Sequence, residues 1–534
     1  MKKIPFIYQE KLSNIHFDRQ SEKPSEAVFF IYFFAIGILF IVMVLRLFQL
    51  TIVKGDYYRT LSEQNRIKEI PIEAPRGQII DRKGFVLAKS ETPDTNKVKD
   101  ISSKRIYFEP EVIATLIGYR QQADKVDLTT DNCLYKLKLG NRTGKKGVEN
   151  IYDCALRGVP GKKLIEIDAR GNYLKTIDII KPTTGQTIQL AVDLDLQKKA
   201  HELLAGKEGA VVINNPKNGE ILGFVSSPSY NPQDFEDLNQ EMIGKYLTDP
   251  KKPLFNRITE GVYPPGSLFK LAIATAALQE GSIDEKTQFD DTGQITAGTL
   301  RFGNWYYLQY GKTEGLVDIV KAIKRSNDTF FYLAGAKTGV EKIKKWSEIL
   351  GFGKKTGITM DEEVGIIPGP FWKQETIHDQ WYLGDTYNLS IGQGYMTVTP
   401  LQTLLATSVF ANGGYLCQPL LLKNDSPRCK KLPISQKNID LIKEGMRQAC
   451  STGGTGWPLF DFKAGGKPIQ TACKTGTAES ESKSGLPHAW ITVFAPYDNP
   501  EIAMTILVET AGQGSDVAGP IAKELLKTYF ERSQ

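Results

Sequence analysis

The sequence predicts an α+β protein that is held in a membrane by one N-terminal helix. Three observations support this fold class: residues 27–45 carry no charge, residues 46–190 are rich in short strand-like runs, and the remainder has the order strands, long helical middle, strands, final helix. With 534 residues, of which 41% are hydrophobic and 24% charged, the chain is long enough for two or three folded domains.

Residues 27–45 form a run of nineteen uncharged, mostly apolar residues. At helical rise this run nearly covers the roughly 30 Å hydrocarbon core of a bilayer, so it predicts a transmembrane helix. Arg46 and a further apolar stretch follow directly, which favours a permanent anchor over a cleaved signal peptide. Basic residues are nearly balanced on the two sides, and only Lys2 and Lys3 favour the cytoplasm for the short tail. We therefore expect residues 1–26 in the cytoplasm and the folded body on the periplasmic or extracellular side of the cytoplasmic membrane.

Two domains are predicted after the span. Residues 46–190 contain short strands, among them a hairpin whose turn at 81–84 ends in glycine, and they suit a pedestal and not an active site. From residue 191 the chain passes through an amphipathic helix into a hairpin around 215–219, and two further strand-like runs lie close to the C-terminus. We expect residues 191–534 to form an antiparallel sheet packed against helices, with the first and last segments of the domain in one sheet.

Charge and cysteine content bear on partners and on metal binding. The net charge of +6 is the small difference between 67 basic and 61 acidic residues, and no dense Lys/Arg run with interleaved aromatic residues is present, so no nucleic-acid partner is expected. The six cysteines show neither a CxxC pair nor a Cys/His spacing suited to zinc. Cys417 and Cys429 could pair across a short loop, but the favoured interpretation is small buried hydrophobic side chains.

The pattern S-x-x-K occurs at Ser267 and again at Ser480, and the surroundings distinguish the two. Ser267 opens a run that is apolar around most of its circumference, which predicts a buried helix, whereas Ser480 lies in a polar segment punctuated by Gly and Pro. On the first turn of a helix Lys270 can reach Ser267, and its apolar neighbours predict a lowered pKa and a neutral base. The alternative is a capping serine beside a lysine whose charged end reaches solvent.

Two further motifs follow. K-T-G occurs at Lys337, Lys355 and Lys474, but the first two follow helical runs and are interpreted as helix ends, whereas Lys474 follows a strand-like segment. An edge strand at Lys474 could bind an extended peptide by main-chain pairing. Ser326 and Asp328 lie between two helical runs, which predicts a hydroxyl and a carboxylate on a short break between helices.

The order and spacing of Ser267-x-x-Lys270, Ser326-x-Asp328 and Lys474-Thr-Gly-Thr resemble the active-site serine penicillin-recognising enzymes. The stretches PLFNRITEGVYPPGSLFK, SNDTFFYLAG and HAWITVFAP are similar to elongation-type class B transpeptidases, the penicillin-binding protein 2 family. APRGQIIDRKGFVLA and KKGVENIYDCALRGVPG resemble that family's pedestal. The resemblance implies a serine β-lactamase-like transpeptidase domain with a five-stranded antiparallel sheet.

The resemblance also implies a role for each matching residue. Ser267 would attack the carbonyl carbon of a D-Ala-D-Ala stem peptide of peptidoglycan and form an acyl-enzyme, and β-lactams would acylate the same oxygen. Lys270 would be the base, Ser326 would pass a proton to the leaving amine, and Lys474 would supply positive charge for the substrate carboxylate. The backbone N–H groups of Ser267 and Thr477 would form the oxyanion hole.

Substrate binding is implied for four positions: Asp328, Thr475, Gly476 and Thr477. Gly476 would let the strand approach the substrate without a side-chain clash. Asp328 departs from the Asn of most serine acyltransferases, and an ionised Asp accepts hydrogen bonds but cannot donate one. Some relatives hold a structural zinc between the first two motifs, but residues 282–325 contain neither His nor Cys, so we expect no metal and no cofactor.

Partners and competing functions complete the prediction. The resemblance implies contact with the membrane, a polytopic glycosyltransferase of the SEDS type and the cell-elongation complex. One alternative is a division-type transpeptidase, which typically has small residues after the second motif where this chain has Thr329-Phe330-Phe331-Tyr332. Another is a non-catalytic β-lactam sensor or regulator of a membrane glycosyltransferase, and a third is a β-lactamase. The intact motifs argue against a sensor, and the pedestal and anchor argue against a β-lactamase.

Overall fold

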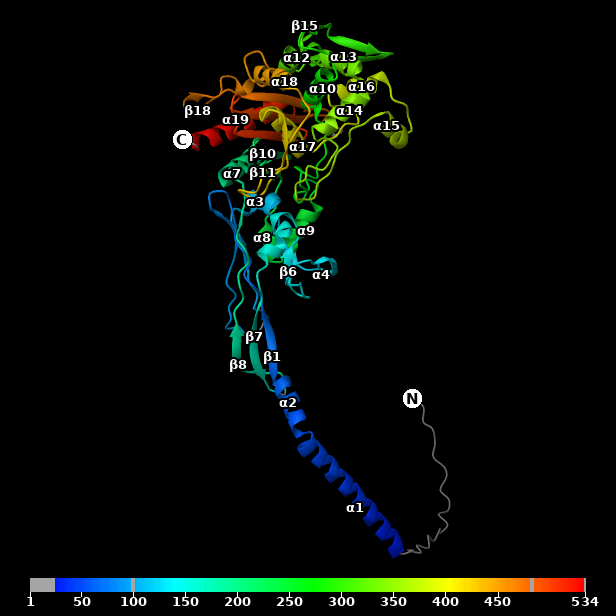
Figure 1. Ribbon diagram of the computed structural model, residues 1–534, viewed down its shortest axis with the longest axis vertical. Coiled ribbons are helices and arrows are strands. Elements are labelled where there is room, and N and C mark those ends of the chain that lie inside the picture. The colour runs from blue at the N-terminus through cyan, green and yellow to red at the C-terminus, as the bar shows by residue number, and fades with distance from the viewer. Residues whose placement is uncertain (1–24, 98–100, 169, 481–484, 533–534) are drawn as a thin grey trace, which may run out of the picture. The chain divides into compact units, whose positions relative to one another are not determined.

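The computed structural model describes residues 25–97, 101–168, 170–480 and 485–532 (Figure 1). The chain divides into two compact units, one formed by the residues up to Ile70 with Lys163–Ile179, the other by Pro71–Lys162 with the residues from Ile180 onward. The predicted cytoplasmic tail falls almost entirely outside the described residues. Most of the predicted pedestal, residues 46–190, lies in the same compact unit as the C-terminal domain.

The first unit is a long apolar helix followed by a small sheet. Helix α1 (Glu26–Phe48) buries none of its residues within the protein, and with a short π-helical turn it continues to Val53. This segment is long and apolar enough to cross a membrane, so the predicted single apolar helix is confirmed. Helix α2 (Gly55–Arg66) leads into a three-stranded sheet with the order β1 (Ile67–Ile72), β7 (Gly161–Ile167), β8 (Tyr173–Ile180).

The second unit begins with the strand-rich part that the sequence predicts. Its main sheet has the order β4 (Arg105–Tyr107), β3 (Val86–Ser90), β2 (Ile79–Ile80), β9 (Ile188–Gln189). The predicted turn is present: Asp81 accepts hydrogen bonds from the backbone of Lys83 and Phe85, both at 2.8 Å, and Gly84 has φ of +92°. Around this sheet lie short elements: α3 (Pro110–Ile117), β5 (Arg120–Gln122), α4 (Lys125–Thr130), β6 (Arg142–Gly144), α5 (Gly147–Ile151) and α6 (Asp153–Leu156).

Buried charges join this part to the C-terminal domain. The guanidinium of Arg120 pairs with Glu236, at the end of α8 (Pro232–Glu236), at 2.5 Å, and with Glu73 at 2.7 Å. Arg105 donates from Nε to Glu149 at 2.7 Å and from its backbone to Glu236 at 2.9 Å. Unpaired charges at such positions would be strongly destabilising, so the network fixes the two parts to each other.

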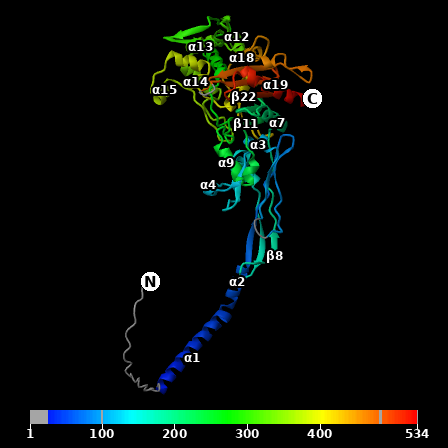
Figure 2. The same cartoon turned by 180° about the vertical axis from the view of Figure 1, so that it is seen from behind.

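The C-terminal domain is built on a five-stranded antiparallel sheet, as the sequence predicts. Its order is β11 (Ile221–Ser227), β10 (Gly209–Asn214), β22 (Ile502–Val508), β21 (His488–Ala495), β20 (Ala472–Ala478). The first and last strand segments of the domain therefore share one sheet. A hydrophobic cluster that includes α7 (Leu194–Leu203) and α19 (Gly514–Arg532), both labelled in Figure 2, covers one face. A larger cluster that includes α10 (Lys270–Gln279) and α17 (Pro400–Ala411), labelled in Figure 1, covers the other.

Helices form the rest of this domain. Helix α10 is buried along nearly its whole length, which confirms the predicted central helix. The other helices are α9 (Gln240–Thr248), α11 (Trp305–Tyr310), α12 (Ile319–Arg325), α13 (Asp328–Thr338), α14 (Val340–Ile349), α15 (Pro370–Ile377), α16 (Leu383–Ser390) and α18 (Gln436–Ala449). Four two-stranded ribbons complete it: β12 (Phe289–Asp291) with β15 (Gly315–Val317), β13 (Gln294–Ala297) with β14 (Leu300–Gly303), β16 (Tyr415–Cys417) with β17 (Cys429–Lys431), and β18 (Lys463–Ala464) with β19 (Lys467–Pro468).

The favoured interpretation of the cysteines as unpaired hydrophobic residues is wrong. All six are paired, as Cys133–Cys154, Cys417–Cys429 and Cys450–Cys473. Cys417 and Cys429 lie opposite each other in the β16–β17 ribbon. Cys450 directly follows α18 and Cys473 lies on β20, so the fold brings together two residues whose sequence spacing carries no recognisable pattern.

Candidate active site

The backbone around Ser267 depends on glycine. Gly266 has φ of +52° and opens a 3₁₀ turn that leads into α10, and its N–H donates to the carbonyl of Gly392 at 2.9 Å. A Cβ atom on Gly266 would lie 2.9 Å from the carbonyl oxygen of Thr477. This close packing holds half-buried Ser267 against β20, the strand that carries the K-T-G motif.

Lys270 is buried at the start of α10 and lies among polar partners from the second motif. Its Nζ donates to Asp328 Oδ1 at 2.6 Å, to the Ser326 carbonyl at 2.7 Å and to Ser326 Oγ at 3.3 Å. Burial lowers the pKa of Lys270, against the opposing effect of the Asp328 carboxylate. The lowered pKa agrees with the sequence prediction. Within the described part of the chain, however, the hydrogen bonds of Lys270 go to Ser326 and Asp328 and not to Ser267.

Ser326 is a single residue with left-handed backbone angles between two helices. It ends α12 with φ of +53°, and α13 begins two residues later at Asp328. Asn327 caps α13, because its side chain accepts a hydrogen bond from the backbone of Phe330 at 2.8 Å. The predicted helix break is therefore present, and it directs the Ser326 hydroxyl towards the lysines.

A buried carboxylate that sequence reasoning missed supports this break. Asp291 accepts hydrogen bonds from Asn304 at 2.7 Å, from Asn327 at 2.9 Å and from Thr329 at 2.9 Å. Asp291 lies thirty-five residues before Ser326, and no local pattern marks it. Its oxygens are occupied by amide and hydroxyl donors, and the surrounding segment lacks His and Cys, so these residues do not fit a zinc ion.

The Asp328 carboxylate contacts two other parts of the site. One carboxylate oxygen accepts from Lys270, and the other accepts from the backbone N–H of Trp305 at 2.8 Å. The side chain is largely buried. Both oxygens thus already have partners inside the protein, and the geometry favours a residue that positions Lys270 over one that contacts substrate.

Lys474 and Lys270 approach the same hydroxyl. Lys474 Nζ donates to Ser326 Oγ at 2.8 Å and to the carbonyl of Thr475 at 2.8 Å, and its side chain is fully buried. Burial lowers the pKa of Lys474 well below its usual range, and the neighbouring Lys270 lowers it further. The Ser326 hydroxyl therefore lies between two lysines that burial shifts towards their neutral forms, an arrangement suited to proton transfer.

The remaining positions of the K-T-G-T motif, Thr475, Gly476 and Thr477, differ in their surroundings. A Cβ on Gly476 would lie 3.0 Å from Cβ of Trp490 and 3.1 Å from Cγ of Leu268, so glycine is needed for packing against the serine segment. The substrate role expected for Gly476 stays a prediction beside this packing role. Thr475 is buried and donates to Thr455 Oγ1 at 2.8 Å, whereas Thr477 is exposed.

β20 is the edge strand of the sheet, and side chains on one of its faces are tied to the segment that follows α18. The Cys450–Cys473 disulfide joins the strand to the end of α18, directly beside Lys474. The Thr455–Thr475 hydrogen bond adds a second link, and Ser515 donates to the carbonyl of Thr455 at 2.7 Å. These links hold the strand that carries the motif lysine.

The other motif matches lie away from this cluster. Ser480 donates to the carbonyl of Leu486 at 2.6 Å in a loop, and Lys483 falls outside the described residues. Lys337 is exposed in the last turn of α13, and Thr356 of the other K-T-G donates to Glu362 at 2.7 Å. The three motifs of the prediction, by contrast, meet at Ser326.

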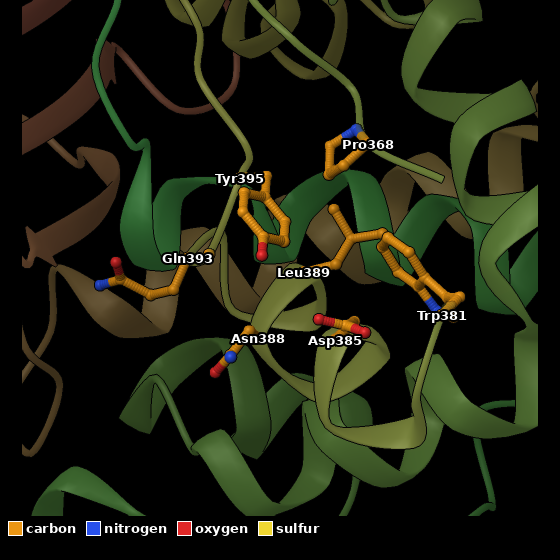
Figure 3. Close-up of a pocket in the computed structure, with 8 residues that line it drawn as sticks. Pro368, Trp381, Asp385, Asn388, Leu389, Gln393 and Tyr395 are labelled. Atoms are coloured by element: carbon orange, nitrogen blue, oxygen red, sulfur yellow. The ribbon is translucent and has the colours of Figure 1, made fainter. Parts of the chain in front are cut away.

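A pocket of about 200 Å³ adjoins the serine segment (Figure 3). Its walls come from α16, from the loop that follows α16 and from neighbouring loops, and they are formed by Pro368, Trp381, Asp385, Asn388, Leu389, Gln393, Gly394 and Tyr395. The Gln393 side chain reaches the carbonyl of Thr477 at 3.5 Å, and Gly392 accepts from Gly266. No sequence motif marks this pocket.

Comparisons with known proteins agree with this arrangement. Residues 209–527 match the penicillin binding protein transpeptidase domain and residues 96–190 match the penicillin-binding protein dimerisation domain. The chain is 31% identical to the peptidoglycan D,D-transpeptidase MrdA of Haemophilus influenzae, over 93% of this chain and 91% of the relative, and 29% identical to that of Escherichia coli, over 92% of each.

Solved structures show the same similarity. The structure of PBP2 from Helicobacter pylori in complex with MreC is similar with a TM-score of 0.74 and 29% identity, covering 88% of this chain and 99% of that one. The structure of Pseudomonas aeruginosa PBP2 in complex with WCK 5153 gives a TM-score of 0.73 and 31% identity, covering 86% and 96%.

Proposed function

Since the chain belongs to the penicillin-binding proteins that carry a transpeptidase domain, we propose that it cross-links the stem peptides of peptidoglycan during cell elongation. The observation that carries this proposal is the meeting of the three motifs. Ser326 Oγ lies 2.8 Å from Lys474 Nζ and 3.3 Å from Lys270 Nζ. Lys270 is the first residue of α10, the helix that begins beside Ser267. The proposed activity is that of a serine-type D,D-transpeptidase, and D-Ala-D-Ala carboxypeptidase is proposed as its side activity.

Acylation begins at Ser267. Its Oγ attacks the carbonyl carbon of the penultimate D-Ala, and its proton passes to the neutral form of Lys270, which burial favours. The negative charge that develops on the carbonyl oxygen is stabilised by the backbone N–H groups of Ser267 and Thr477. Gly266 supports this arrangement, because its packing against Thr477 brings the two backbone segments together.

The leaving group needs a proton. Ser326 lies within hydrogen-bonding distance of Lys270 and Lys474. It can therefore receive the proton that Lys270 has taken up and give its own proton to the nitrogen of the departing D-Ala. A bound terminal carboxylate opposes the effect of burial and favours the protonated form of Lys474, which then holds the carboxylate by charge. The amine of a second stem peptide then attacks the ester carbon, a new amide bond forms, and Ser267 regains its proton through Lys270.

The substrate chain is proposed to lie along the free edge of β20. An extended peptide can pair with the main chain of an edge strand, and Thr477 is exposed there while Thr475 is engaged with Thr455. We therefore keep Thr477 as a substrate-contacting residue and assign Thr475 and Gly476 to the support of the strand.

The catalytic body is proposed to lie on the outer side of the cytoplasmic membrane. Disulfides form and persist in oxidising compartments, and three of them follow the membrane helix in this chain.

The proposed partners rest on solved relatives, which include a complex of PBP2 with MreC and a peptidoglycan synthase complex. We propose an elongation complex with a polytopic glycosyltransferase as the assembly in which this chain acts.

Covalent labelling with a fluorescent penicillin tests the proposal. The full-length protein in detergent should form a persistent adduct, Ser267→Ala should abolish it, and Ser480→Ala, the matched serine of the other S-x-x-K, should leave it unchanged. An adduct that is rapidly hydrolysed would indicate a β-lactamase, and a wild-type protein that never forms one would indicate a non-catalytic regulator. Either result would overturn the assignment.

A further inference from the structure

Hydrogen bonds from several segments of the chain converge on the buried carboxylate of Asp291, the last residue of β12. The donors are two side-chain amides, one hydroxyl and two backbone N–H groups, and they belong to Asn304, Asn327, Thr329, Gly293 and Glu314. A carboxylate offers about four lone-pair sites, so these donors fill its capacity to accept hydrogen bonds. Asp291 is therefore an internal acceptor enclosed by protein, and not a group that meets substrate.

The three residues after Ser326 are all tied to this carboxylate. Asn327 and Thr329 donate to it directly, at 2.9 Å each. The backbone N–H of Asp328 donates to Oδ1 of Asn304 at 3.0 Å, and the side-chain amide of that residue carries the link on to the carboxylate. Ser326 itself has φ of +53°, a conformation that a residue other than glycine keeps only when its surroundings hold it. The network thus holds the backbone that places the Ser326 hydroxyl.

Both side-chain amides are fixed from their other end as well. The oxygen of Asn327 accepts from the backbone of Phe330 at 2.8 Å, and the oxygen of Asn304 accepts from the backbone of Asp328. Each amide therefore turns its NH₂ group towards the carboxylate, and an amide binds a metal through its oxygen. A cation beside Asp291 would meet hydrogens instead of lone pairs. These residues thus do not fit the structural zinc that some relatives hold between the first two motifs.

We propose that Asp291 is a positioning residue for the Ser326 hydroxyl, and that its hydrogen bonds take the place of the structural metal of those relatives. Asp291 acts through Asn327 and Thr329 and needs no contact with substrate. The network consists of hydrogen bonds alone, so it forms without a metal and offers nothing for a chelator to remove. This inference rests on the proposed transpeptidase function, in which Ser326 passes a proton to the leaving amine.

Zinc content and chelation test the replacement of the metal. The full-length protein, purified in detergent without a chelator, should contain far less than stoichiometric zinc by elemental analysis. Dialysis against EDTA should leave its rate constant for acylation by a fluorescent penicillin unchanged. Stoichiometric zinc, with loss of acylation after chelation and recovery when zinc is added back, would overturn the proposal.

Two substitutions of Thr329 form a matched pair, because Thr329→Ser keeps the hydroxyl that donates to Asp291 and Thr329→Val replaces it with a methyl group. Thr329→Val should lower the acylation rate constant roughly tenfold, because the lost hydrogen bond to a charged group no longer favours the productive position of Ser326. Thr329→Ser should stay near the wild-type value. Asp291→Asn should have a larger effect, since it would place N–H groups against the two side-chain amides. Asp290→Asn, at the exposed neighbouring position, is its control.

A Ser326→Ala background separates positioning from general support of the fold. Without the hydroxyl there is nothing left to position, so Thr329→Val should change the residual acylation rate by less than about twofold in that background. An equal fall in both backgrounds, or equal rates for Thr329→Val and Thr329→Ser, would overturn the positioning role while labelling of Ser267 in the wild type still supports the transpeptidase. If no penicillin labels Ser267, the proposed function fails, and the role of Asp291 in it fails as well.

Discussion

Lys270 and Asp328 form a buried ion pair in which Nζ and Oδ1 lie 2.6 Å apart. The pair links the first and second motifs of the site. Most serine acyltransferases have Asn at the position of Asp328. The charged carboxylate has an effect that Asn lacks: it raises the pKa of Lys270, whereas burial lowers that pKa.

Asp328→Asn is expected to shift the pH dependence of acylation. The Asp328 carboxylate raises the pKa of Lys270, so its removal lowers that pKa further. Acylation needs the neutral lysine, which persists to lower pH when the pKa falls, so the acidic limb of the rate profile should move to lower pH. Rates of penicillin acylation between pH 4.5 and 8.5 measure this shift. Asp290→Asn, at an exposed carboxylate on β12, serves as the control. A limb that moves to higher pH would contradict the argument.

Removal of the Cys450–Cys473 disulfide is expected to slow acylation. The bond holds β20 beside Lys474, whereas Cys417–Cys429 links a ribbon that carries none of the motif residues. Serine replacement of either pair should destabilise the protein by about 2–4 kcal/mol. Only the loss of Cys450–Cys473 should lower the acylation rate of the protein that remains folded. Equal rates in the two double variants, at a temperature where both are folded, would refute this role.

Gly476→Ala is expected to reduce acylation more than it reduces stability. The added methyl group would press on Leu268 and Trp490, and overpacking costs about 1–3 kcal/mol. The displaced segment carries Ser267, so activity should fall severely. Gly244→Ala is the counterpart on α9, where nothing lies within 4 Å of the added atom, and it should leave activity intact and raise the melting temperature slightly. Full acylation by Gly476→Ala would refute the packing role.

Glu236→Ala is expected to destabilise the C-terminal domain and its strand-rich neighbour together. The substitution leaves the buried Arg120 guanidinium without its closest carboxylate, which costs about 3–5 kcal/mol in comparable buried pairs. Glu241→Ala breaks the exposed pair with Lys245 on α9 and should cause no measurable change. Urea unfolding of both variants measures the difference. A small effect of Glu236→Ala would show that water replaces the carboxylate.

Local patterns account for the parts of the structure that were predicted correctly. The apolar helix, the buried α10, the turn at Asp81–Gly84 and the break at Ser326 each depend on residues close together in the sequence. The sharing of one sheet by the first and last strands followed from the order of strands, a long helical middle and strands along the chain.

The unpredicted features depend on contacts between distant segments. Asp291 meets Asn327 through tertiary packing, Gly392 meets Gly266 across more than a hundred residues, and Cys450 meets Cys473 because α18 ends beside β20. The hydrogen bond from the backbone N–H of Trp305 to Asp328 was not predicted either, because the two residues are 23 positions apart. No pattern in one sequence records such pairings.

The complete pairing of the six cysteines has a consequence for the unfolded chain. Disulfide exchange starts with attack by a thiolate, and this protein contains no free cysteine to supply one. In the absence of added thiol, heat or urea therefore separates helices and strands without rearranging the three covalent links. A denatured sample therefore keeps the native disulfide connectivity until a reductant is added.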